Sequence, residues 1–384
     1  MLSRIVERFV VQSYLYPAFS LPSPILTFAD QFAFRPTGST TAALIALYQQ
    51  ISDFLVNEPY VRVVVLDFSK AFDTVRHSAL IGKVNSLGLH TSISGWIDDF
   101  LSQRSHVTSF CGTTSPPLPI TASVVQGSAL GPSLYAITAA DLKTLDGKNR
   151  LTKFADDTYL LVPASNIDTT DKELEHIEAW ASANNLKLNK DKSRELIFTV
   201  SKRSKAEAVP PIMGIERVSS LKCLGITLST NFTFAEHIDT TVSSCSSNLF
   251  ALKVLKTKGL PPKQIYKVFN ATVLSKLVYA SQFWWGFTSA SDRDRLEAVV
   301  RRAIKSDLCS PDVSIPDRCC SADEKLLNKV LCNPRHVLYQ FIPPRRVSCY
   351  STRSKGTLRD FILPTKTSLR AKLFPTRLLY PLSY

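Results

Sequence analysis

The sequence predicts an α+β fold, in which strands that carry acidic residues come first and a run of amphipathic helices follows. The β-branched stretch at 61–66 is typical of a buried strand. Two short apolar stretches, 151–154 and 159–162, flank an Asp-Asp pair and indicate a β-hairpin with the acids at its turn. Apolar residues at helical spacing beyond residue 233 indicate the helical part.

The elements before the hairpin follow from the same patterns. Helical spacing predicts three helical segments, the last of them broken at Gly88: 1–20, 39–57 and 78–103. Residues 106–125 indicate strands around a loop that contains Pro116, Pro117 and Pro119.

Two capping-box patterns predict helix starts in the second half of the chain. Residues 170–173 (Thr-Asp-Lys-Glu) predict the start of a helix that buries Leu174, Ile177 and Ala181. Residues 233–236 predict another capped helix, which carries an apolar stripe (Ile238, Val242, Cys245, Leu249 and Leu252) and ends near Gly259. The other expected segments are a helix at 131–142, strands at 194–200 and 221–228, and helices at 262–280 and 291–306.

Length and composition describe a globular chain with an excess of positive charge. With 384 residues, 45% of them hydrophobic, the chain is long enough for two or three lobes and unlike a disordered protein. Its net charge of +14 indicates a polyanionic partner, and because no apolar stretch reaches membrane-spanning length, nucleic acid is favoured over a membrane. Arg4, Glu7 and Arg8 interrupt the first apolar stretch, which is unlike a signal peptide.

The eight cysteines are scattered without regular spacing, which favours reduced thiols in an intracellular protein. Cys319, Cys320, Cys332 and His336 raise the question of a zinc site. Adjacent cysteines lack the short Cys-x-x-Cys spacing of common zinc sites, so thiols without metal are the favoured interpretation.

The last part of the chain is strongly basic. Residues 301–384 carry 16 Lys or Arg against 6 Asp or Glu, so most of the net charge lies there. The segment also contains Pro343-Pro344-Arg345-Arg346 and four interspersed aromatic residues: Tyr339, Phe341, Tyr350 and Phe361. Basic residues among aromatic ones suit a phosphate backbone with stacked bases, whereas a solvated extension explains the same composition equally well.

Three carboxylates make the candidate site. Asp156 and Asp157 are adjacent at the predicted turn, where both side chains can approach one cation although bare carboxylates repel each other. Asp67 closes the strand at 61–66, where a carboxylate is costly unless it is paired or metal-bound. Taken alone, the pair would be a solvated turn and Asp67 a helix N-cap. Together they form a set able to hold two Mg²⁺ ions about 4 Å apart, which serve in-line displacement at phosphorus.

The motifs around these acids resemble those of LINE-type (non-LTR) retrotransposon reverse transcriptases. The stretches at 67–73, 126–132 and 154–157 (Phe-Ala-Asp-Asp) are similar to motifs A, B and C of that family. Three further similarities follow the family's order: a fingers motif at 31–40, motif D at Trp180 and 189–192, and a primer-grip turn at Leu224-Gly225. The resemblance therefore implies an RNA-directed DNA polymerase that uses an RNA template, a DNA primer and dNTPs.

The resemblance also implies roles for single residues. Asp67 and Asp156 would bridge both Mg²⁺ ions, with Mn²⁺ as an alternative ion. Asp157 would be a less direct ligand, and the backbone carbonyl of Phe68 would add a further oxygen. Phe72 stands where the family has an aromatic steric gate, which excludes a ribose 2′-hydroxyl; the alternative is a core phenylalanine.

Other residues match the family's nucleotide contacts. Gln126 and Gly127 match residues that line the nucleotide and template pocket, although Val125 stands where the family usually has proline. Arg35 matches a fingers residue that contacts the triphosphate, and Lys192 matches a lysine that protonates pyrophosphate. For both basic residues, an ordinary surface position is the alternative.

The implied architecture is a right-hand polymerase palm with partial fingers and a helical thumb. The segments would be partial fingers at 1–60, a palm at 61–232, a helical thumb at 233–310 and a basic tail at 311–384. Within the palm, the resemblance implies an inserted fingers segment at about 85–125 and the primer-grip turn near 221–228. The family's upstream fingers strands and endonuclease domain have no counterpart here, so an N-terminally truncated copy is expected.

Two other functions remain open at this stage. One is a catalytically inactive remnant that only binds nucleic acid. The other is a different palm polymerase, such as an RNA-dependent RNA polymerase, against which Phe72 and the Phe-Ala-Asp-Asp motif argue. The resemblance implies a protein of the nucleus, the cytoplasm or both, whereas the oligomeric state is not indicated.

Overall fold

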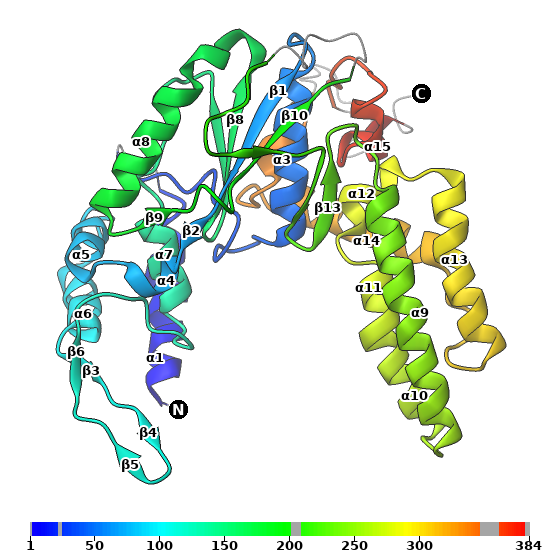
Figure 1. The fold of residues 1–384 in the computed structure, drawn as a ribbon, viewed down its shortest axis with the longest axis horizontal. Coiled ribbons are helices and arrows are strands. Elements are labelled where there is room, and N and C mark those ends of the chain that lie inside the picture. Colours follow the sequence, from blue (N-terminus) through cyan, green and yellow to red (C-terminus); the bar gives the residue numbers. More distant parts are fainter. Residues whose placement is uncertain (1, 22–24, 201–208, 346–360, 381–384) are drawn as a thin grey trace, which may run out of the picture. The chain divides into compact units, whose positions relative to one another are not determined.

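In the computed structural model, the described residues are 2–21, 25–200, 209–345 and 361–380 (Figure 1). The chain divides into two compact units. The first unit consists of Met1–Ala43, Asn57–Ile197 and Arg203–Val218, and the second of Leu44–Val56, Phe198–Lys202 and Ser219–Tyr384. The first mixes strands and helices and the second is mainly helical, so the predicted α+β fold class is confirmed.

Among the described residues, five strands form the main sheet, in the order β11-β10-β1-β8-β7. Their bounds are β1 (Val61–Leu66), β7 (Arg150–Phe154), β8 (Asp157–Pro163), β10 (Arg194–Phe198) and β11 (Glu216–Arg217). Strand β8 pairs antiparallel with both β1 and β7. This register sets Leu66, the last residue of β1, opposite Thr158, next to the turn of the β7–β8 hairpin.

Most helices of the first unit lie where the sequence predicts them. Gly88, with a φ of +67°, separates α5 (His77–Asn85) from α6 (Thr91–Leu101). The helix after Gly131 is shorter than predicted. The others are α1 (Leu2–Val10), a π-helical turn (Val11–Leu15), α2 (Tyr16–Ala18), α4 (Ala71–Thr74), α7 (Gly131–Thr138) and α8 (Thr170–Ala183). Helix α3 (Thr40–Phe54) runs from the first unit into the second along the chain.

The segment after α6 is a long hairpin of short strands, with a loop at two of the three predicted prolines. Strand β3 (Arg104–His106) pairs with β6 (Leu118–Ile120), and β4 (Ser109–Phe110) pairs with β5 (Thr113–Thr114). Pro116 and Pro117 lie in the predicted loop, between β5 and β6, whereas Pro119 lies within β6. The hairpin itself turns at Cys111 and Gly112. The φ angles of Cys111 and Gly112, +48° and +79°, suit a two-residue hairpin turn. Proline is tolerated in β6 because an edge strand can accommodate it.

The capping box predicted at 170–173 is also wrong. The Thr170 hydroxyl donates to the Ile167 carbonyl at 2.6 Å, and no side chain caps α8. The buried Glu173 carboxylate instead accepts the backbone N–H groups of Leu145 and Asp146, at 3.0 and 2.9 Å. A local pattern cannot reveal this role, because the loop that Glu173 binds comes from another part of the chain.

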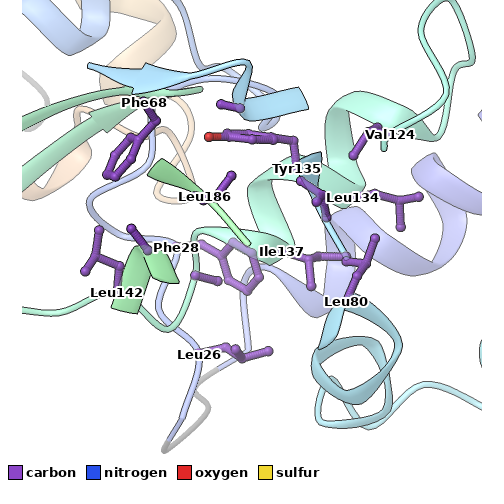
Figure 2. Close-up of a cluster of buried hydrophobic side chains, with 14 of the residues drawn as sticks. Leu26, Phe28, Phe68, Leu80, Val124, Leu134, Tyr135, Ile137, Leu142 and Leu186 are labelled. Atoms are coloured by element: carbon purple, nitrogen blue, oxygen red, sulfur yellow. The ribbon is translucent and has the colours of Figure 1, made fainter. Parts of the chain in front are cut away.

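The core of the first unit joins α7 to the strands and loops around it (Figure 2). Leu134, Tyr135 and Ile137 of α7 are each at most 2% exposed. They belong to one cluster with residues from distant segments, including Leu26, Phe28, Phe68, Leu80, Val124, Leu142 and Leu186. Burial of this cluster therefore fixes the segments that carry motifs A, B and D against each other.

In the second unit, a hairpin of β12 (Ser220–Cys223) and β13 (Ile226–Ser229) precedes the helices. The long helix α9 (Ala235–Thr257) buries the predicted stripe, except that Val242 is only half-buried. Its predicted capping box is wrong, because the Thr233 hydroxyl donates to Asn231 Oδ1 at 2.8 Å. Figure 1 shows α10 (Pro262–Phe269) running beside α9.

The remaining helices of the second unit include one that the sequence analysis missed. Helix α14 (Ile315–Leu331) lies in the segment predicted as a basic tail, and the Ser314 hydroxyl caps it by accepting the Asp317 N–H at 3.3 Å. The other helices are α11 (Ser275–Leu277), α12 (Ser281–Trp284), α13 (Ala290–Lys305) and α15 (Thr376–Leu379). Arg346 and Tyr350 of the predicted basic tail lie outside the described residues. Across the described ranges, every helix is too short or too polar to cross a membrane.

Candidate active site

The Asp156-Asp157 pair lies at the turn between β7 and β8, as predicted. Phe154 and Asp157 are partners in the hairpin register, so only Ala155 and Asp156 form its tip. Ala155 has a φ of +56°, in the left-handed region. Asp67 follows the last residue of β1 directly, at the end of the sheet where the hairpin turns.

Asp67 lies close enough to both hairpin acids to interact with them electrostatically. Burial, and then the charges of Asp156 and Asp67, raise the pKa of Asp157 to about 6. Burial also raises the pKa of Asp156, where Asp67 adds to the effect and a backbone hydrogen bond opposes it. Because Asp67 acts on both hairpin acids, chain positions far apart in sequence share one site. Such a set of repelling carboxylates favours a bound cation.

The three carboxylates suit a Mg²⁺ ion that is only partly coordinated by protein, rather than a metal ion enclosed by protein ligands alone. Within the described ranges, no group of three or more His, Cys, Asp or Glu side chains is placed so as to hold a metal ion by itself. Mg²⁺ commonly takes one or two carboxylates and completes its octahedron with water and substrate phosphates. The carboxylate oxygens of these acids, which repel one another, could therefore supply some of the ligands of a Mg²⁺ ion, and water and substrate would supply the rest.

The segment that begins at Asp67 is tied to the predicted motif D. The Asp67 carbonyl accepts the Asn189 N–H at 2.8 Å, and the Asp67 N–H donates to Ser193 Oγ at 3.3 Å. Strand β2 (Phe68–Ser69) pairs with β9 (Lys187–Leu188). Lys192 lies exposed in the same loop, and its role toward pyrophosphate stays a prediction.

The predicted steric gate, Phe72, packs between two aromatic rings. Its ring stacks on Tyr135, with centroids 4.2 Å apart, and meets Phe34 edge-on at 6.2 Å. Burial, and then the charges of Asp156 and Asp157, raise the pKa of Tyr135. Tyr135 thus contacts Phe72 and also interacts electrostatically with the hairpin acids, whereas the role of Phe72 as a steric gate stays a prediction.

Gln126 and Gly127 lie in the loop before α7. The Gln126 amide donates to Asp73 Oδ1 at 2.9 Å, which links the predicted motif B to motif A. Gly127 has a φ of +81°, a conformation that favours glycine over residues with a Cβ. Neither observation tests a nucleotide contact, which stays a prediction.

Arg35 is more enclosed than a surface arginine. Its guanidinium donates to the backbone carbonyl of Phe28 and, at 3.3 Å, to that of Gln31. Burial lowers the pKa of Arg35, and the nearby Asp30 carboxylate opposes that effect. Contact with a triphosphate would require that some of these backbone contacts be given up, and this role stays a prediction.

In the second unit, Leu224 and Gly225 form the turn between β12 and β13, as predicted. Both have positive φ angles, +48° and +84°. The Tyr279 hydroxyl donates to the Leu224 carbonyl at 3.0 Å, and its ring lies against Gly225. The turn is therefore rigidly held, whereas its role toward a primer stays a prediction.

Two residues that support the site were missed by the sequence analysis. Tyr135 is the aromatic residue of α7 that stacks on Phe72, and its only sequence signal is its place one helical turn after Gly131. Glu7 of α1 is 3% exposed, and its carboxylate accepts the N–H groups of Ala129 and Leu130, at 2.6 and 3.3 Å. Glu7 thereby holds the start of α7, where a carboxylate is stabilised by the helix dipole.

Comparison with known proteins identifies the family. The family model described as "Reverse transcriptase (RNA-dependent DNA polymerase)" matches residues 1–228. The chain belongs to the reverse transcriptase family. It is 29% identical over 293 residues to the probable RNA-directed DNA polymerase from transposon BS of Drosophila melanogaster, and 29% identical over 298 residues to that from transposon X-element of the same species. The predicted resemblance to non-LTR retrotransposon enzymes is confirmed.

These matches cover unequal shares of the proteins. They include 72% and 73% of this reverse transcriptase chain but 32% of each relative, so the chain spans about a third of the length of those relatives. Among solved structures, the telomerase of Candida tropicalis in complex with a telomeric RNA fragment is similar, with a TM-score of 0.49 and 13% identity. That match covers 80% of this chain and 46% of the telomerase chain.

Proposed function

We propose that this chain is the polymerase portion of a retrotransposon reverse transcriptase, which extends a DNA primer by copying an RNA template. The observation that supports the proposal best is the convergence of Asp67, Asp156 and Asp157, whose repulsion a divalent cation would relieve. Membership of the reverse transcriptase family supports the same reaction. The proposed segments, with a palm at 61–232 and a helical thumb at 233–310, keep the boundaries expected from the sequence.

In the proposed reaction, the primer 3′-oxygen attacks the α-phosphorus of a dNTP. One O–P bond forms, the bond from that phosphorus to the bridging oxygen breaks, and pyrophosphate leaves. Two Mg²⁺ ions, or Mn²⁺ in their place, would act as Lewis acids on the attacking and leaving oxygens. Asp67 and Asp156 would hold both ions, and Asp157 and the Phe68 carbonyl would add oxygen ligands. Lys192 would give a proton to the departing pyrophosphate.

The same proposal gives the surrounding residues roles in selecting the nucleotide. Phe72 would lie under the sugar and exclude a 2′-hydroxyl, in keeping with its place near the acids. Gln126 and Gly127 would line the nucleotide and template pocket, and Arg35 would contact the triphosphate. Leu224 and Gly225 would hold the primer end.

Template and primer would bind through the positive charge of the chain. The net charge of +14 suits a polyanion, and affinity should fall steeply as salt rises, because each phosphate contact releases counterions. A flat salt response would contradict an electrostatic nucleic-acid surface. We further propose that this copying takes place at nuclear DNA after synthesis of the protein in the cytoplasm.

Primer extension tests the proposal directly. On poly(rA)/oligo(dT) with Mg²⁺, we expect dTTP incorporation that the Asp156→Ala variant abolishes and that chelation of Mg²⁺ removes. Asp99→Ala is the matched control, because this carboxylate is exposed on α6 and should leave incorporation unchanged. Incorporation that survives Asp156→Ala would contradict the proposed metal site.

The same assay separates the alternatives. Template binding without any incorporation by the unaltered chain would favour a remnant that only binds nucleic acid. Preferential use of rNTPs over dNTPs would favour an RNA-dependent RNA polymerase. We expect dNTPs to be preferred, because of the position of Phe72.

A further inference from the structure

The turn that carries the hairpin acids contains a residue in an unfavourable conformation. Ala155 directly precedes Asp156 and has a φ of +56°. The left-handed region costs a residue with a Cβ roughly 1–2 kcal/mol. Ala155 is also buried, with 8% exposure, so its backbone N–H and carbonyl need partners within the protein. Contacts from elsewhere must therefore hold this turn in place.

The side chain of Gln31 supplies both partners. The Ala155 N–H donates to Gln31 Oε1 at 3.0 Å, and Gln31 Nε2 lies 3.5 Å from the Ala155 carbonyl oxygen, which accepts its hydrogen bond. Gln31 is 1% exposed, so water does not compete for these groups. A primary amide is suited to this task, because it offers one acceptor and one donor side by side.

Gln31 is itself fixed by the backbone around it. Its Oε1 also accepts the Ala33 N–H at 3.0 Å. Gln31 pairs with Lys153 of β7 in a parallel bridge. On either side of that bridge, the Lys153 N–H donates to the Asp30 carbonyl at 2.7 Å and the Phe32 N–H donates to the Lys153 carbonyl at 2.8 Å. Residues 30–32 therefore act as a short extra strand beside the hairpin.

A buried ion pair strengthens the same attachment. Lys153 is fully buried, and its Nζ lies 2.9 Å from Asp30 Oδ2. The same amine donates to the carbonyls of Ala139 and Leu142, each at 2.9 Å. Every one of its donors is thus used, as a buried ammonium group requires. The result is a rigid base from which Gln31 reaches the turn.

We propose that Gln31 is a positioning residue of the polymerase site, which sets the backbone of the turn and thereby the spacing of Asp156 and Asp157 toward the metal ions. The inference rests on the proposed function. Gln31 is 1% exposed, so we expect no direct contact between its side chain and the substrate. It acts through Ala155, because a turn that relaxes from its left-handed conformation would re-aim the carboxylate of the next residue.

Direct metal binding tests this role apart from catalysis. Mn²⁺ binding to the purified chain is measured by electron paramagnetic resonance, and the Mg²⁺ concentration for half-maximal primer extension is measured in parallel. Gln31→Met keeps the volume of the side chain and removes both hydrogen bonds to Ala155. We therefore expect the Mn²⁺ dissociation constant and the half-maximal Mg²⁺ concentration each to rise about tenfold. Gln31→Glu keeps the acceptor and loses the donor but adds an acidic group whose charge would itself attract a cation, so Gln31→Met decides the test.

Asn149→Leu is the matched control. Asn149 is a buried amide, 3% exposed, just before β7 begins, and donates to Glu173 and Thr169 at 2.9 Å. Its loss should lower the midpoint of thermal unfolding, as Gln31→Met does, and leave Mn²⁺ and Mg²⁺ binding unchanged. An equal loss of metal binding in both variants would show a general effect of destabilisation and overturn the proposal.

The outcomes distinguish this inference from the proposed function. Folded Gln31→Met with unaltered Mn²⁺ affinity would overturn the role of Gln31, whatever the polymerase activity. If the unaltered chain incorporates no nucleotide, the proposed function fails. Weakened Mn²⁺ binding in the Gln31 variants would still show that Gln31 positions the carboxylates.

Discussion

The ring of Phe72 stacks on the ring of Tyr135, with centroids 4.2 Å apart and planes inclined by 23°. Tyr135 is 2% exposed and belongs to the core of the first unit (Figure 2), whereas Phe72 is half-buried. A buried tyrosine therefore covers one face of the Phe72 ring. The two interpretations of Phe72, as a gate and as a core residue, are therefore compatible.

Replacement of Phe72 should relax sugar discrimination. In Phe72→Ala, we expect the ratio of ribonucleotide to deoxynucleotide incorporation to rise by at least about tenfold, because the ring no longer meets the 2′-hydroxyl. Tyr135→Leu should give a smaller rise, since the gate stays but loses its support. Single-nucleotide incorporation kinetics measure both ratios. Unchanged discrimination in Phe72→Ala would leave Phe72 as a packing residue only.

Glu195 should be critical for the stability of the first unit. Its side chain is fully buried and lies between two arginines, with Arg62 Nε at 2.7 Å and Arg217 Nε at 2.8 Å. Glu195→Gln would leave these buried charges without a counter-charge, so the free energy of unfolding should fall by about 3 kcal/mol. Urea unfolding measures the change.

The control for Glu195 is an ion pair at the surface. Glu216, whose side chain is 66% exposed, lies 3.2 Å from Arg194 Nε. Glu216→Gln should change the free energy of unfolding by less than about 1 kcal/mol, because solvent screens the pair. Equal effects of the two substitutions would refute a special role for the buried network.

The turn at Gly225 should not tolerate a side chain. Its φ is +84°, and an added Cβ would lie 3.1 Å from Tyr279 Cε1. Gly225→Ala should therefore destabilise the second unit by about 1–2 kcal/mol. Gly82→Ala is the contrast, because a Cβ within α5 meets nothing within 4 Å and should be neutral or stabilising. Thermal unfolding of both variants provides the measurement, and equal midpoints would contradict the strain at Gly225.

His237 should make the second unit sensitive to acid. Burial, and then the charge of Lys222, lower the pKa of His237 from 6.5 to about 4. Between these values the unfolded chain binds a proton at this residue that the folded chain excludes. The contribution of His237 to stability is therefore constant above pH 6.5 and falls as pH drops toward 4. The full loss is about 3 kcal/mol.

Unfolding by urea at several pH values between 7.5 and 4 checks this effect. His237→Gln should reduce the loss of stability between pH 6.5 and 4, because glutamine does not titrate. His90→Gln, at an exposed residue, should preserve it. A pH dependence that persists unchanged in His237→Gln would assign the acid sensitivity to other groups.

The sequence by itself determined the elements whose signals are local. The strand at 61–66 has the predicted bounds, because a β-branched apolar run has few alternatives to a buried strand. The β7–β8 hairpin and the break at Gly88 also follow from neighbouring residues. The order of the motifs was sufficient to indicate the reverse transcriptase family, which the comparisons confirm.

Only the tertiary structure decided which side chains support the site. Gln31 and Ala155 are 124 residues apart in the chain, and Arg62 and Glu195 are further apart still. Glu173 matched a local capping pattern but binds a loop instead. A side chain chooses its partner by the free energy of the whole packed arrangement, in which a buried polar group must find a hydrogen bond. That choice depends on backbone segments that are brought together only by folding.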